Sequence, residues 1–147
     1  MKARQIDRDG RRAFMVVFDR GDNVPEGLTS FARDHGLDGA RISGVGGFES
    51  ATLGFFDWES KSYLEIPVDE QVEVLSFDGD ISRTPDGDPQ VHVHVVVGKR
   101  DGTTAGGHLM RGRVRPTMEV IVDESPERLN RVHDAESGLD LIAPDQR

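Results

Sequence analysis

Short apolar runs bounded by turn residues occur along most of the chain and predict a strand-rich fold. The run from Ala13 to Phe18 is apolar and β-branched and ends at a turn-like Asp-Arg-Gly-Asp segment, which is typical of a strand buried on both faces. Further strand-like runs are bounded by Gly, Pro, Asp or Ser, and they cover residues 40–43, 50–58, 62–66, 72–81, 90–99 and 117–123.

One segment has the periodicity of an amphipathic helix. Between residues 24 and 35, apolar side chains recur at Leu28, Phe31 and Ala32, which is the i, i+3, i+4 spacing of a single helical face. A proline lies near the start of this segment and Gly36 follows its end, as expected at the two ends of a helix. This segment is the main helix that the sequence predicts.

The remaining chain indicates a single domain over residues 1–147. No repeat, low-complexity block or linker divides it, so we expect an α+β fold with a largely antiparallel or mixed sheet of about seven strands and one main helix. Residues 128–133 follow Ser-Pro-Glu, a typical helix start, and are expected to form a short helical turn. The last dozen residues are expected to be peripheral.

Composition narrows the class of protein. No apolar run approaches the roughly 20 residues of a membrane-spanning helix, and the first ten residues lack the apolar stretch of a secretory signal. With no cysteine, disulfides, a thiolate nucleophile and cysteine-ligated zinc are excluded. We therefore expect a cytoplasmic protein without membrane contact, in which any metal is held by histidine and carboxylate.

The acidic balance weighs against direct DNA binding. The chain has 27 acidic and 18 basic residues and a net charge of -9, which repels the phosphate backbone. Basic residues gather locally in positions 1–20 and 99–115, where a small anionic ligand could still bind. DNA is thus a disfavoured partner.

Three of the five histidines are predicted to meet on one hairpin. Strict alternation in Val-His-Val-His-Val puts the imidazoles of His92 and His94 on one face of a strand. If residues 100–102 form a three-residue loop, the returning strand places His108 opposite His94. A two-residue loop would shift this register by one, although a bulge at Gly106-Gly107 could restore it.

Three neutral imidazoles converging from one side form a recognisable metal-binding arrangement. They can bind Zn²⁺ at about 2.0–2.1 Å each and leave a fourth position for water or a substrate oxygen. In the alternative interpretation, His92 and His94 are hydrogen-bonded histidines of a half-buried strand. His35, near a helix end, and His133 are interpreted as surface or capping residues.

Several sequence segments resemble, in order and spacing, the plants and prokaryotes conserved (PPC) domain family over about residues 10–133. They are Gln71–Ile81, Val91–His94, Gly106–Leu109 and Thr117–Val120, with Gly21-Asp22 and Gly44-Val45-Gly46 before them. The resemblance implies an α+β fold around a largely antiparallel sheet and assembly as a homotrimer. In prokaryotic members it also implies a histidine-bound metal, zinc or another divalent ion, for which His92, His94 and His108 are the matching positions.

In plants the same domain follows an AT-hook, a short basic element that lies in the minor groove of DNA. The nearest counterpart here is Arg111-Gly112-Arg113-Val114, which lacks the proline of that element and lies inside the predicted domain. We interpret it as a chance match, and transfer of a DNA-binding function on this ground would be associational.

The histidine arrangement is also similar to the zinc site of acetolactate decarboxylase, an enzyme of similar fold. This similarity implies a zinc ion that polarises a carbonyl oxygen. Such a site needs an acid or base, for which Glu73 and Glu119 are the candidates, and an anion clamp, for which Arg41 and Arg83 are the candidates. In the alternative interpretation, the two glutamates are supporting carboxylates or surface strand residues, and the arginines are solvated loop ends.

Three hypotheses follow. The first is a homotrimeric metal-binding PPC-type domain with a role in ligand sensing or assembly, in which the apolar residues Phe55, Phe56 and Trp58 contribute to subunit contacts. The second is a zinc-dependent lyase or hydrolase acting on a small oxo- or hydroxy-acid or ester. The third is a DNA-associated regulatory protein.

Overall fold

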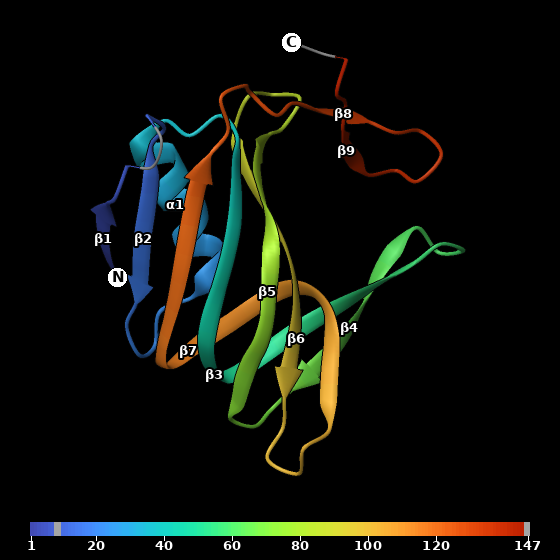
Figure 1. Ribbon diagram of the computed structural model, residues 1–147. Coiled ribbons are helices and arrows are strands. Elements are labelled where there is room, and N and C mark those ends of the chain that lie inside the picture. The colour runs from blue at the N-terminus through green and yellow to red at the C-terminus, as the bar shows by residue number, and fades with distance from the viewer. Residues whose placement is uncertain (8–9, 146–147) are drawn as a thin grey trace.

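One antiparallel sheet of seven strands organises the chain, with a single helix among the described residues packed on one side of it (Figure 1). The computed structural model describes residues 1–7 and 10–145. The elements are β1 (Lys2–Gln5), β2 (Ala13–Phe18), α1 (Val24–His35), β3 (Ala40–Asp57), β4 (Ser62–Val68), β5 (Val72–Arg83), β6 (Pro89–Gly98), β7 (Thr104–Glu124), β8 (Arg131–His133) and β9 (Asp140–Ile142). The predicted α+β fold is confirmed.

The strands follow the order β1-β2-β7-β6-β5-β3-β4, and β7 also pairs with β3. The start of β7 pairs with β6 through residues 104–108, and the rest pairs with β3 through residues 108–124. Because β5 pairs with both β3 and β6, these four strands close into a ring. His108 lies where β7 changes partner, opposite His94 of β6 and Gly54 of β3.

The core lies between this sheet and α1, which packs against β6 and β7. The predicted helical face is buried, and the ring of Phe31 meets that of Phe14 from β2 edge-on at 5.3 Å between centroids. On β6 the alternating valines Val93, Val95 and Val97 are buried, as is Pro89 at the start of the strand. His92 and His94 alternate with these valines and therefore face away from the helix.

The ends of α1 agree with the prediction. Pro25 lies in its first turn, and Gly36 follows the last turn in the left-handed conformation at φ 59°. The backbone N–H of Leu37 donates to the carbonyl of Ala32 at 2.9 Å, which closes the final turn. A residue with a side chain is strained at this φ, so glycine here marks the helix end.

The separate strands predicted at 40–43 and 50–58 form one strand, β3, because the glycines between them are used for close approach and not for a turn. A Cβ on Gly46 would lie 2.4 Å from the carbonyl oxygen of Thr117, and one on Gly47 would lie 2.5 Å from that of Arg115. The register shifts here as β3 bends along β7. In the same way, β7 is continuous where the sequence predicts two separate segments.

The C-terminal part also differs from the prediction. The short helical turn expected at residues 128–133 is replaced by β8, whose backbone pairs with β9 at Val132 and Leu141. At the other end, β1 pairs with β2, although its polar sequence gives no strand pattern. None of the described residues belongs to a helix long and apolar enough to cross a bilayer.

Candidate metal centre

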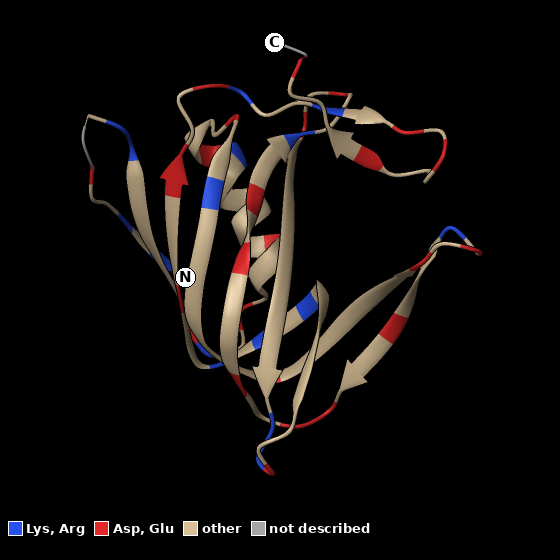
Figure 2. Cartoon of the chain, turned by 45° about the vertical axis from the view of Figure 1, so that its right-hand side comes forward, with Lys and Arg blue, Asp and Glu red and all other residues tan. Residues whose placement is uncertain are grey.

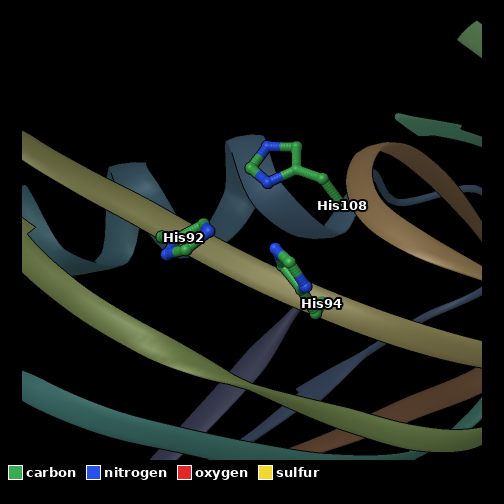
Figure 3. Close-up of side chains that lie close together, drawn as sticks. All are labelled: His92, His94 and His108. Atoms are coloured by element: carbon green, nitrogen blue, oxygen red, sulfur yellow. The ribbon is translucent and has the colours of Figure 1, made fainter. Parts of the chain in front are cut away.

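The β6–β7 hairpin brings the three predicted histidines together (Figure 3). Its loop has three residues, since the N–H of Lys99 donates to the carbonyl of Thr103 at 2.8 Å. His94 and His108 are therefore direct register partners, as the first of the two predicted registers requires. His92 shares their face because it lies two residues from His94 along the strand.

The three rings converge closely enough to share one ion. One nitrogen from each of His92, His94 and His108 lies within 4.8 Å of the other two. Ring centroids are separated by 5.0 Å for His92 and His94, 5.2 Å for His92 and His108, and 5.7 Å for His94 and His108. Zn–N bonds of about 2.0–2.1 Å bring ligand nitrogens to about 3.4 Å apart, which small ring rotations would reach.

The electrostatics of the cluster favour neutral imidazoles. Burial, followed by the neighbouring His92 and His94, lowers the pKa of His108 to about 4. Burial and then His92 also lower the pKa of His94. Near neutral pH both rings are thus unprotonated, which is the form that binds a metal. The buried Nδ1 of His108 has no hydrogen-bond partner among the described residues.

A carboxylate that the sequence reading missed supports His92 from β5. Asp80 is the register partner of His92, and its Oδ2 lies 3.4 Å from His92 Nδ1. Its Oδ1 accepts from Arg131 at 2.8 Å and from the hydroxyl of Ser82 at 3.0 Å. Burial alone would raise the pKa of Asp80, but the contacts with His92 and Arg131 outweigh it and hold the pKa below its usual value. Asp80 therefore stays ionised and fixes the orientation of His92.

The paired residues 51–57 of β3 and 62–68 of β4, with the turn between them, form the β3–β4 arm. Aromatic side chains from this arm lie beside His108 as a wall. The ring of Tyr63 lies 4.9 Å from the His108 ring at an angle of 35°, and Phe56 meets Tyr63 at 5.4 Å. Gly54 allows this approach, since a Cβ there would lie 2.8 Å from the Tyr63 ring. This wall keeps water from one side of the cluster and contributes to the burial that lowers the pKa of His108.

The predicted acid–base candidates lie elsewhere on the sheet. Glu73 is exposed and pairs with Gly98, at the end of β6 away from His92. Glu119 is exposed on β7, where its register partners are Val17 and Val45. Among the described residues, the group of side chains close enough to share a metal consists of the three histidines.

The two predicted anion clamps differ in their surroundings. Arg83 lies at the end of β5, where its Nε donates to Asp38 at 2.7 Å. Arg41 lies within β3 as the register partner of Asp80, and its guanidinium is exposed, 3.9 Å from Asp78. Arg41 is therefore the candidate that shares a sheet face with the histidines.

The other two histidines have local roles, in agreement with the sequence. His35 Nδ1 lies 3.0 Å from the carbonyl oxygen of Phe31, and its ring packs 5.2 Å from that of Phe14. His133 lies 3.3 Å from the carboxylate of Asp140 on the exposed C-terminal hairpin. Neither belongs to the cluster.

The basic stretch on β7 is paired with acidic side chains. Arg111 lies 3.2 Å from Glu65, and Arg113 and Arg115 lie 3.2 Å and 3.6 Å from Glu49. Figure 2 shows positive and negative residues interspersed over the molecule. The structure thus gives no concentrated basic surface at this position.

The position of Asp80 opposite His92 could have been predicted by counting residues along the two strands, whereas the position of Arg131 could not. The loop between β5 and β6 pairs Arg83 with Pro89, and counting from that pair places Asp80 opposite His92. The sequence indicates an ordinary loop over residues 83–90, and no register was counted across it. Arg131 comes from a segment with no strand periodicity, so its position depends on tertiary packing.

Sequence comparison identifies the family. A family model of the Plants and Prokaryotes Conserved (PCC) domain, the PPC domain named above, matches residues 6–126. The chain belongs to this family. A metal-containing protein of Archaeoglobus fulgidus is 35% identical and superposes with a TM-score of 0.82, over 89% of this PPC chain and 92% of that one.

Two further relatives carry other names. A candidate DNA-binding protein of Ralstonia eutropha JMP134 is 31% identical, with a TM-score of 0.82 over 88% of this chain and 90% of that one. The bifunctional protein GlmU of Synechococcus sp. (strain JA-3-3Ab) is 36% identical over 121 residues, which is 80% of this PPC chain. The match covers only 18% of that protein.

Proposed function

We propose that this PPC domain is a cytoplasmic, homotrimeric protein in which each chain binds one divalent ion, zinc, through His92, His94 and His108. The observation that carries the proposal is the buried Nδ1 of His108, which has no partner among the described residues and lies in a cluster with two further imidazoles. A buried polar atom left unpaired costs about 1–3 kcal/mol, which a bound ion would offset. The similarity to a metal-containing protein supports the same conclusion.

The residues around the triad suit an ion with one open position. Three protein ligands leave a fourth position for water or a ligand oxygen, where zinc acts as a Lewis acid. Asp80 orients His92, and Tyr63 shields His108 from water. Arg41, exposed on the same face, supplies a positive charge for a small anionic ligand. We therefore assign the domain a role in ligand sensing or assembly.

Exposed apolar side chains support assembly into a trimer. Phe55 and Leu64 are register partners on the β3–β4 arm, and they are 61% and 51% exposed. Leu75 on β5 is 59% exposed. Apolar area of this kind is typical of subunit contacts. Light scattering should give a mass of three chains, and a monomer would contradict the trimer.

A zinc-dependent lyase or hydrolase for a small oxo- or hydroxy-acid or ester is the second candidate function. The open coordination position and the exposed Arg41 favour it, because a metal-bound carbonyl or carboxylate needs both. Substitution His94→Ala should then abolish turnover and leave the fold intact. Unchanged turnover would contradict an enzymatic role.

The description of the Ralstonia eutropha relative supports a DNA-associated role. The net charge of -9 and the glutamate partners of Arg111 and Arg113 oppose it. We expect no binding to duplex DNA even at low salt, and a salt-dependent complex would restore this hypothesis.

The proposed metal site is tested by the metal content of tag-free protein after reconstitution with zinc. Mass spectrometry should find one zinc per wild-type chain and none in the double variant His92→Ala/His94→Ala. The matched control is His35→Ala/His133→Ala, which removes two histidines outside the cluster and should retain the ion. A wild-type chain without metal after reconstitution would overturn the proposal.

A further inference from the structure

Arg131 is a buried charged side chain outside the histidine cluster. It lies on β8 and is only 6% exposed. Its Nε donates to Ser82 Oγ at 2.7 Å, its Nη2 to Asp80 Oδ1 at 2.8 Å, and its Nη1 to the carbonyl oxygen of Asp140 at 2.9 Å. A guanidinium is costly to bury unless its donors are satisfied, so these contacts fix its position.

The contacts of Arg131 lead directly to His92. Asp80 uses one carboxylate oxygen for Arg131 and Ser82, and the other lies 3.4 Å from His92 Nδ1. Because Oδ1 is held in this way, the plane of the Asp80 carboxylate is fixed. Oδ2 is thereby held in the position from which it accepts the Nδ1–H of His92. The other ring nitrogen, Nε2, is then left with its lone pair free for a metal.

This support comes from a part of the chain that the family match does not reach. The family model ends at residue 126, whereas Arg131 belongs to the segment 127–143 that carries β8 and β9. That segment is also joined to the rest of the chain by backbone hydrogen bonds and by the ion pair of Arg128 with Asp38. The N–H of Arg83 donates to the carbonyl of Leu129 at 2.8 Å, and Lys61 at the tip of the β3–β4 arm donates to the carbonyl of Glu136.

We propose that Arg131 is a positioning residue of the metal centre, through which docking of residues 127–143 and metal binding strengthen each other. The inference rests on the proposed function, since it assumes an ion on the three histidines. Because coupling between two binding events is reciprocal, a segment that orders His92 for the ion must itself be held more firmly when the ion is bound. Loss of an outer partner of a histidine ligand typically lowers metal affinity about 10–100-fold.

Zinc affinity, measured by competition with a chromophoric chelator, tests the first half of the proposal. Arg131→Met should weaken zinc binding, though by less than the about 10–100-fold expected on loss of Asp80, the direct partner of His92. Two milder variants should each have a smaller effect. Arg131→Lys keeps the charge but loses the several N–H donors of the guanidinium, and Ser82→Ala removes one partner of the guanidinium. The matched control is Arg128→Met, because Arg128 belongs to the same segment but pairs with Asp38 at 3.2 Å. Because this exposed ion pair does not contact Asp80, Arg128→Met should change zinc affinity far less than Arg131→Met does.

Amide hydrogen exchange tests whether metal binding strengthens the docking of residues 127–143. The measurement on the wild-type chain does not require any variant to fold. Adding zinc should slow exchange in residues 131–142 of the wild type. The same zinc concentration should produce little slowing there in Arg131→Met, in which the connection to Asp80 is lost.

The outcomes separate the two proposals. Wild-type protein that binds no zinc overturns the metal site and this inference with it. Zinc binding that is equal in wild type and Arg131→Met, with no added protection of residues 131–142, overturns the positioning role alone. A weaker affinity in Arg131→Met together with zinc-dependent protection in the wild type supports it.

Discussion

The histidine triad (His92, His94 and His108) and the arginine row (Arg111, Arg113 and Arg115) lie on the same hairpin and strand but differ in whether their side chains have partners. Each arginine is paired with a glutamate across the sheet surface. In the triad, one buried nitrogen has no partner among the described residues, and the pKa values of two rings are lowered. In this chain the candidate site therefore lies where a buried group is left unsatisfied, and not where charged side chains are most numerous.

The largest effect is expected from breaking the triad itself. His94→Ala removes one of three ligands and should lower zinc affinity by more than about 100-fold, beyond the effect of losing an outer partner. The double variant Arg111→Ala/Arg113→Ala should bind zinc as the wild type does, because its ion pairs lie outside the cluster. Chelator competition measures both. Equal affinities in the two variants would remove the distinction between the regions.

A second test alters the backbone that supports the triad. Gly79 lies between Asp78 and Asp80, and a Cβ there would meet the carbonyl oxygen of His92 at 2.0 Å. Gly79→Ala should therefore force β5 and β6 apart and lower the free energy of unfolding by about 3 kcal/mol. Urea denaturation measures the loss.

Gly106→Ala is the control for this substitution. A Cβ on Gly106, on the same hairpin, has its nearest contact at 3.2 Å, to the carbonyl oxygen of Val95. We expect it to cost less than about 1 kcal/mol. If Gly79→Ala were as stable as Gly106→Ala, β5 could not approach β6 as closely as the structure has it.

The elements that could be predicted are those decided by local pattern. The helix at 24–35 follows from its apolar spacing and from the left-handed glycine at its end. The pairing of His94 with His108 follows from strand alternation and a short loop, both of which are local. The valine and histidine faces of β6 follow from the same alternation.

The parts that could not be predicted depend on contacts distant in sequence. The sequence pattern interrupts the predicted strand around Gly46 and Gly47, because the carbonyls that approach these glycines belong to β7, some 70 residues later. Arg131 lies 51 residues from Asp80. Its role is invisible in a segment whose sequence resembles a helix start. The sequence pattern therefore located the histidines, whereas the position of Arg131 beside Asp80 required the fold.

The folding stability of the metal-free protein at acidic pH provides a third test, in which we expect a smaller effect. The pKa of His108 is lowered from 6.5 to about 4 in the folded chain, so the unfolded chain takes up a proton first as the pH falls. His108 should therefore cost no stability above pH 6.5, destabilise the fold increasingly between pH 6.5 and about 4, and add nothing further below that.

Thermal unfolding at several pH values, compared between wild type and His108→Gln, measures this contribution. The glutamine variant cannot take up the proton and should lose less stability than the wild type as the pH falls through this range. Parallel pH profiles for the two proteins would show that His108 is not held neutral by burial.

The smallest effect is expected in the arginine row. Arg113→Ala breaks an exposed ion pair with Glu49 and should change the free energy of unfolding by less than about 1 kcal/mol. The difference should shrink further at high salt. A larger loss in urea denaturation would mean that the row contributes to the fold and is not merely a neutralised surface.

Anomalous diffraction at the zinc edge, from crystals of the protein loaded with zinc, shows directly whether the three histidines hold the ion. We expect one strong peak per chain, within bonding distance of His92, His94 and His108. A chain without a peak among these three side chains, or with its peak at His35 or His133, would contradict it.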